Sequence, residues 1–168
     1  SRLGASGEFI RLEATVSRLQ SFRPYLHLYT EVGAQVADGS LLVSEQCGYG
    51  GGSVGRAYDP FEMAGDHCLK GLAEVRYDVQ METWANDWAI NMVQIYGLAD
   101  FGYVLKSGDV IAPDTRNNTG ASLGLGMRWR ALDHVSGLVE VVQPIGMGVA
   151  FEDGEQNARV FFGLSLDY

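Results

Sequence analysis

The chain has 168 residues, and its 12 lysines and arginines are outnumbered by 21 aspartates and glutamates, so its formal net charge is −9. This excess of acidic residues argues against binding to nucleic acid, because contact with phosphate groups requires a basic surface. The sequence has no run of about 18 apolar residues, so it predicts no transmembrane helix.

Seven segments alternate between apolar and polar residues. We predict that each forms a β-strand, because successive side chains of a strand point to opposite faces. In chain order they span residues 8–20, 24–36, 68–79, 89–104, 119–131, 134–146 and 157–168. Within each segment the charged residues fall almost entirely on one parity, and Arg18, near a strand end, is the exception. Each predicted strand therefore has one apolar face and one polar face.

The last segment, Ala158 to Tyr168, shows the alternation most clearly, since every second residue is apolar and the last one is aromatic. About ten tilted strand residues cross the hydrocarbon of a bilayer, whereas strands of soluble proteins are usually about five or six residues long. A closed barrel pairs every backbone group between strands, so it can span lipid with an apolar outer face and a wet lumen. The pattern therefore predicts an all-β protein, an antiparallel transmembrane β-barrel. A soluble barrel or sandwich is the alternative.

The connections between the predicted strands alternate in length. Short or intermediate turns are predicted at 21–23, 80–88 and 132–133, and longer loops at 37–67, 105–118 and 147–156. Barrels of the bacterial outer membrane have short periplasmic turns and longer extracellular loops. The alternation therefore favours an outer-membrane location with Tyr168, and hence the C-terminus, on the periplasmic side.

Seven strands cannot close a single-chain barrel of this kind, which has an even number of strands. Either one strand escapes the pattern and the chain is a small eight-stranded barrel, or these are the last strands of a larger one. No signal peptide is found at Ser1, although an outer-membrane protein requires one. We therefore expect the chain to be mature, truncated or a fragment, and the long loop favours a fragment.

The long connection at about residues 38–67 carries a glycine-rich run with Gly51 and Gly52, followed by Arg56-Ala57-Tyr58. A second motif, Ala99-Asp100-Phe101-Gly102, lies in the fourth predicted strand. With the strand from 122 to 130 and the aromatic-ended terminal strand, these motifs resemble the barrel of two-partner secretion transporters, the hemolysin activation/secretion family of the Omp85 superfamily. The resemblance covers essentially the whole chain and implies that residues 1–168 are the C-terminal portion of a barrel of about sixteen strands. Ala57 departs from the glycine that the family often has there.

In such transporters the sixth loop folds back into the lumen and its arginine pairs with an aspartate of a strand. The resemblance therefore implies that the loop at about 38–67 enters the lumen and that Arg56 pairs with Asp100. Guanidinium and carboxylate can form two parallel hydrogen bonds, which fix orientation as well as charge. Other charges of the polar parity are expected to line the lumen or to hold the loop, namely Glu74, Arg76, Arg128, Arg130 and Glu140.

The resemblance implies a channel and not an enzyme. The barrel would secrete or activate an unfolded passenger protein of the hemolysin or adhesin type, which periplasmic POTRA domains receive; these domains and the earlier strands are absent from the chain. Outer-membrane lipid would surround the barrel, and the barrel assembly machinery would take up its terminal strand, which carries Phe162, Leu164, Leu166 and Tyr168. Two alternatives stay open. One is an Omp85-type assembly factor for other outer-membrane proteins, and the other is a small eight-stranded structural or adhesive barrel.

Cys47 and Cys68 bracket the long loop, where members of the family usually have other residues. Because the periplasm and the cell surface permit disulfides, we predict a Cys47–Cys68 bridge, which would stabilise the fold by about 3 kcal/mol on the chain-entropy model. The three histidines lack the spacing of metal ligands, and the sequence offers no catalytic constellation. We therefore expect no catalytic residues, no metal and no cofactor.

Overall fold

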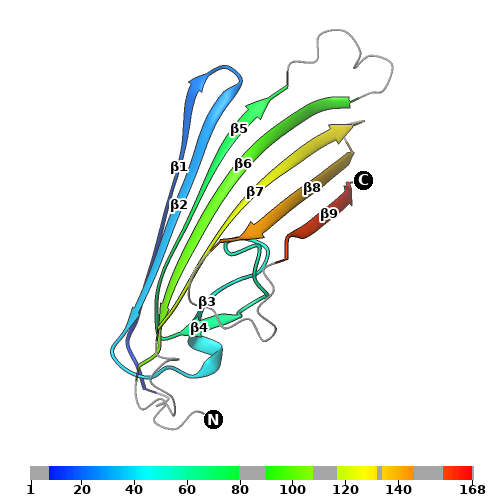
Figure 1. Ribbon diagram of the computed structural model, residues 1–168. Coiled ribbons are helices and arrows are strands. Elements are labelled where there is room, and N and C mark those ends of the chain that lie inside the picture. Colours follow the sequence, from blue (N-terminus) through cyan, green and yellow to red (C-terminus); the bar gives the residue numbers. More distant parts are fainter. Residues whose placement is uncertain (1–7, 80–89, 108–116, 132–133, 146–156, 168) are drawn as a thin grey trace.

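The structure, a computed structural model, describes residues 8–79, 90–107, 117–131, 134–145 and 157–167. In this part of the chain the secondary structure consists of strands and one short 3-10 turn, which confirms the predicted all-β class. Seven antiparallel strands form one sheet in the order β1-β2-β5-β6-β7-β8-β9 (Figure 1). They are β1 (Arg11–Arg23), β2 (Leu26–Ala37), β5 (His67–Asp78), β6 (Ile90–Leu105), β7 (Asn117–Ala131), β8 (Val135–Pro144) and β9 (Arg159–Leu166).

Each of the seven predicted strands corresponds to one strand of this sheet. The longest, β6 and β7, have 16 and 15 residues. Strands β1 and β9 are the two edges of the sheet and are not paired with each other. The described residues therefore form an open antiparallel sheet and not a closed barrel.

The connection between β2 and β5 contains structure that the alternation did not predict. A 3-10 turn, η1 (Val43–Glu45), precedes a small hairpin of β3 (Cys47–Tyr49) and β4 (Met63–Gly65). We call residues 38–66 the docked loop, because they pack against one face of the large sheet. Its apolar side chains Tyr49, Val54, Tyr58 and Met63 share a buried core with sheet residues that include Leu72, Tyr96, Leu98, Val104 and Val142.

The docked loop is tied to both edges of the sheet by ion pairs. Arg11 of β1 lies 3.0 Å from the carboxylate of Glu45, and Arg159 of β9 lies 2.7 Å from that of Asp59. One loop of this size can contact both edge strands only because the sheet curves around it (Figure 1). The face that holds the loop is therefore the inner face, and the opposite face is the outer face.

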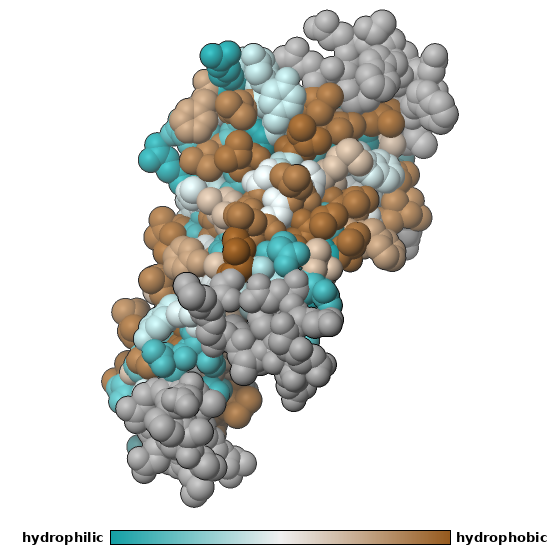
Figure 2. Space-filling model, viewed as in Figure 1, coloured by the Kyte–Doolittle hydropathy of each residue, from teal (hydrophilic) through white to brown (hydrophobic). Residues whose placement is uncertain are grey.

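The two faces differ in chemistry. Large apolar side chains are exposed on the outer face along the sheet, among them Val16, Val32, Val75, Ile95, Leu125, Val141 and Phe162. Figure 2 shows hydrophobic side chains spread over the sheet. Within the described strands, acidic side chains, lysine and arginine lie on the inner face, apart from Arg18 and Arg23 beside the turn between β1 and β2. The structure thus bears out the separation of charge by parity that the sequence predicts.

Candidate functional site

The tip of the docked loop turns tightly at glycines. Gly50 and Gly55 have φ angles of +118° and +82°, a backbone region that other residues adopt only with strain. The N–H of Gly50 donates to the carbonyl of Val54 at 3.3 Å, and the N–H of Tyr58 donates to the carbonyl of Gly55 at 2.9 Å. These turns bring Arg56 and Tyr58 against the inner face of the sheet, where both are buried.

Two glycines form a flat platform beneath the loop. Gly102 of β6 and Gly120 of β7 are register partners across the two strands. The ring of Tyr49 lies so close that an added Cβ would stand 2.2 Å from its Cδ2 at Gly102 and 2.7 Å from its Cε1 at Gly120. Tyr49 itself is 1% exposed. A larger residue at either glycine would displace the ring, so the platform is the receptor for Tyr49.

Polar contacts hold the hydroxyl ends of the two loop tyrosines. The Tyr49 hydroxyl donates to Oδ1 of Asp100 at 2.6 Å, and Ser122 donates to the same oxygen. Burial and the hydrogen bond to the Asp100 carboxylate raise the pKa of Tyr49 above its usual value. The Tyr58 hydroxyl donates to the carbonyl of Ala121 at 2.9 Å. Both tyrosines are therefore fixed at their rings and at their tips.

Arg56 reaches from the loop to two carboxylates on separate strands. Its Nη2 donates to Glu74 of β5 and its Nη1 donates to Glu140 of β8, each at 2.8 Å. Arg56 is 9% exposed, Glu74 0% and Glu140 4%. Burial alone would lower the pKa of Arg56, but the hydrogen bond to Glu74 and the charge of Glu140 outweigh it and raise that pKa. The loop thereby joins β5 to β8 across the two strands between them.

The predicted pair of Arg56 and Asp100 is wrong. Glu74 is the register partner of Leu98, so Asp100 stands one inner-face position, about 7 Å, further along β6. At that level Asp100 is bound by the hydroxyls of Tyr49 and Ser122. The alternation places all these carboxylates on one face, but it does not fix the depth to which a loop descends along that face.

Glu74 also binds two arginines of the sheet. Nη2 of Arg76 lies 2.7 Å away, and Nη2 of Arg128 lies 3.1 Å away. Arg76 stacks over the ring of Tyr29 at 4.4 Å, and Arg128 stacks over that of Tyr96 at 3.9 Å. Guanidinium groups are stabilised over aromatic faces, so each sheet arginine is held on two sides. We call Arg56, Arg76, Arg128, Glu74 and Glu140 the arginine cluster.

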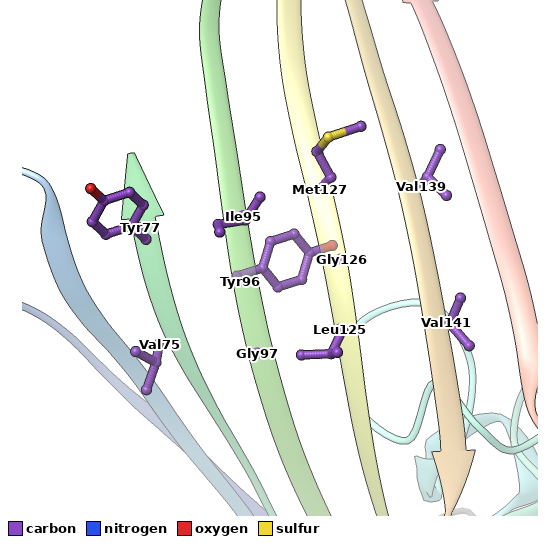
Figure 3. A pocket seen from close by; sticks show the side chains of 10 residues that line it. All are labelled: Val75, Tyr77, Ile95, Tyr96, Gly97, Leu125, Gly126, Met127, Val139 and Val141. Carbon is purple, nitrogen blue, oxygen red and sulfur yellow. The ribbon is translucent and has the colours of Figure 1, made fainter. Parts of the chain in front are cut away.

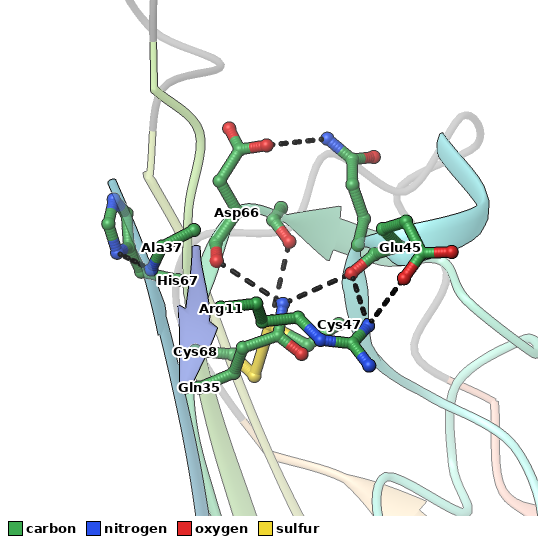
Figure 4. Close-up of a disulfide and its surroundings, with 10 residues drawn as sticks. Arg11, Gln35, Ala37, Glu45, Cys47, Asp66, His67 and Cys68 are labelled. Carbon is green, nitrogen blue, oxygen red and sulfur yellow. Dashed lines mark hydrogen bonds and ion pairs between the residues drawn. A yellow bond between two sulfur atoms is a disulfide. The ribbon is translucent and has the colours of Figure 1, made fainter. Parts of the chain in front are cut away.

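A disulfide fixes the root of the docked loop. It joins Cys47 of β3 to Cys68 of β5, the pair that the sequence predicts, with 6.3 Å between the Cα atoms. Figure 4 shows it beside Gln35, whose amide donates to main-chain carbonyls of the loop. Close by, the fully buried carboxylate of Asp66 accepts the N–H of Ser107 at 2.6 Å. A single aspartate in a loop makes no pattern, so the sequence offered no signal for this contact.

The other predicted motif residues divide between the loop and the last strand. Gly51 has a φ angle of +103° and Gly52 is exposed, while Ala57 is buried at 1% exposure. The terminal-strand residues Phe162, Leu164 and Leu166 are 87%, 68% and 66% exposed on the outer face. Tyr168 lies outside the described residues.

The outer face carries an apolar groove of about 530 Å³ over β5 to β8. Figure 3 shows Val75, Ile95, Leu125 and Val141 around Gly97. None of the residues that line it is charged. The groove is therefore an apolar surface that is open to its surroundings.

Neither a metal centre nor a membrane-spanning helix is found in the part of the chain that the structure describes. Its His, Cys, Asp and Glu side chains form no group of three that could hold a metal ion. None of its helical segments is long and apolar enough to cross a bilayer. No protein-family model matches the chain, and a search of curated proteins finds no match.

Proposed function

We propose that residues 1–168 form the C-terminal portion of an outer-membrane β-barrel that translocates an unfolded secreted partner protein, as two-partner secretion transporters do. One observation carries the proposal: the sheet exposes apolar side chains on its outer face and holds an ion-paired loop on its inner face. An exposed apolar surface that extends over seven strands is far larger than a soluble monomer tolerates. In a membrane barrel the apolar side chains of the outer face would contact lipid, and the charged side chains of the inner face would line a polar lumen.

In this proposal the docked loop narrows the lumen and the arginine cluster sets its position. In this proposal the protein acts as a channel and not as an enzyme. The C-terminus lies on the periplasmic side, and the outer-membrane lipid and the barrel assembly machinery are its other partners. The number of POTRA domains in the complete polypeptide would distinguish secretion of a partner from assembly of outer-membrane proteins.

Two substitutions in β9 test the membrane location. Phe162, at the middle of the strand, lies on the outer face and Ser165 lies on the inner face, and both are exposed. In lipid vesicles, we expect Phe162→Arg to lower the free energy of unfolding of the complete natural polypeptide by roughly 2–4 kcal/mol, because its charge enters hydrocarbon near the bilayer midplane. Ser165→Arg should change it by less than about 0.5 kcal/mol. Urea titration in vesicles gives both values, and equal effects of the two substitutions would contradict a lipid-facing sheet.

A conductance measurement tests the channel. We expect the complete natural polypeptide to produce discrete currents in planar bilayers. A variant with residues 48–64 replaced by a short glycine-serine linker should conduct several-fold more, because the docked loop no longer fills the inner face. Currents that do not change when the loop is removed would contradict a lumen occupied by this loop. The absence of current from both proteins would contradict the channel itself. Release of a co-expressed secreted partner into the medium would then separate protein translocation from plain conductance.

A further inference from the structure

A cavity of about 340 Å³ opens beside the arginine cluster, between the docked loop and the C-terminal strands. Arg56, Arg128 and Glu140 line its polar side, and Leu138 and Phe161 line its apolar side. The cavity therefore presents two guanidinium groups and one carboxylate next to a hydrocarbon wall.

The arginine cluster carries one more positive charge than negative charge. Glu74 is shared by Arg56, Arg76 and Arg128, and among the described residues Glu140 has only Arg56 as a cationic partner. Three further carboxylates on the inner face, those of Glu31, Asp78 and Asp100, are held by hydrogen bonds outside the cluster, and Glu31 accepts from the Tyr29 hydroxyl. Asp78 accepts from Gln94 and contacts His27, and Asp100 accepts from Tyr49 and Ser122. At the cavity itself two guanidiniums, those of Arg56 and Arg128, stand beside one carboxylate, that of Glu140. Charges sheltered from water interact strongly, so this local excess of positive charge attracts an anion.

Arg56 also has an unused donor. Its Nε is buried and has no hydrogen-bond partner among the described residues. A buried donor without an acceptor is unfavourable, so an incoming acceptor would gain from binding it. This orphan donor and the local charge imbalance are independent observations. The donor calls for a hydrogen-bond acceptor and the imbalance calls for negative charge, and a carboxylate supplies both.

We propose that this cavity binds a carboxylate of the polypeptide in transit, that is, an aspartate or glutamate side chain of the passenger. The source of the carboxylate rests on the proposed function. The wall of Leu138 and Phe161 favours a carboxylate on a hydrocarbon stem over a hydrated inorganic anion. Charge-assisted hydrogen bonds from Arg56 and Arg128 supply the affinity. The loop arginine therefore both anchors the loop and forms part of a contact point for acidic segments.

Peptide binding to the complete natural polypeptide in detergent micelles tests this site. The probes are three dye-labelled decapeptides in which glycine alternates with glutamate, glutamine or lysine, and fluorescence anisotropy gives the dissociation constants. We expect the glutamate peptide to bind at least about tenfold more tightly than the other two, as a charge-assisted hydrogen bond implies. Arg128→Gln, which balances the cluster and can keep a hydrogen bond to Glu74, should abolish this preference. Leu138→Trp, which fills the cavity and leaves every charge in place, should weaken binding of the glutamate peptide.

The matched control is Arg11→Gln, which removes an inner-face arginine that is bound to Glu45 at the other edge of the sheet. It should leave the preference unchanged. Equal binding of the three peptides, or a preference that survives both cavity variants, would overturn the proposal. Displacement of the glutamate peptide by acetate at equal concentration would show a site for free carboxylate ions and would overturn the passenger as its source. The binding assay does not depend on conductance, so its failure and the failure of the channel are seen separately.

Discussion

Glu74→Gln is expected to lower the free energy of unfolding of the complete natural polypeptide by roughly 3–5 kcal/mol, the usual result of removing one partner of a buried ion pair. Glu74 is fully buried and is the shared partner of Arg56, Arg76 and Arg128. A neutral amide leaves three guanidinium groups facing one another with Glu140 as the remaining carboxylate. Urea unfolding in lipid vesicles, followed by tryptophan fluorescence, measures the loss.

The control for this substitution is Glu13→Gln, a change of the same chemistry on exposed strand β1. Its effect should stay within about 0.5 kcal/mol, as for most surface substitutions. If the two variants unfold at the same urea concentration, the arginine cluster does not hold the loop. Protease digestion adds a local readout, because Glu74→Gln should expose the docked loop to cleavage and Glu13→Gln should not.

The double substitution Cys47→Ser and Cys68→Ser is expected to lower the free energy of unfolding by roughly 3 kcal/mol, which is the chain-entropy estimate for a bridge of this span. The two cysteines are 21 residues apart, and their bridge limits the conformations of the unfolded loop. Urea unfolding with and without a membrane-permeant reductant measures the effect. Reductant should lower the midpoint of the natural protein and leave that of the double variant unchanged.

Thiol labelling provides the internal check on this result. It must show two blocked cysteines before reduction and two reactive ones after it. If reduction is complete and the unfolding midpoint of the natural protein does not move, the bridge contributes nothing to stability. The hydrogen bonds of Asp66 and Gln35 at the same site would then be sufficient to hold the root of the loop.

The strands and their faces could be predicted because the signal repeats at every second residue. In β6, for example, Ile95, Ala99 and Phe101 alternate with Tyr96 and Asp100, and the structure places these two sets on opposite faces. Every residue of a strand faces one of two different environments, so the alternation within a short segment is enough to predict the strand and its faces. The disulfide could be predicted for a different reason. The sequence contains only two cysteines, so only one pairing within the chain is possible.

The contacts of the loop could not be predicted, because they depend on how segments distant in sequence align. The partners of Arg56 follow from the depth of the loop along the strands, which no local pattern encodes. The platform of Gly102 and Gly120 exists only because β6 and β7 pair in one particular register. The sequence motif singled out Gly102, but its role became visible only with the ring of Tyr49 lying on it.

The strict alternation of the strands also limits how the gene can change length. One inserted codon between Tyr96 and Asp100 would reverse the orientation of every later residue of β6, and would turn Asp100 toward the side that now carries Phe101. Two inserted codons would restore the orientation at the expense of a shifted pairing with β5 and β7. Evolutionary insertions and deletions should therefore collect in the segments between strands, and descendants of this gene should differ most in the lengths of those segments.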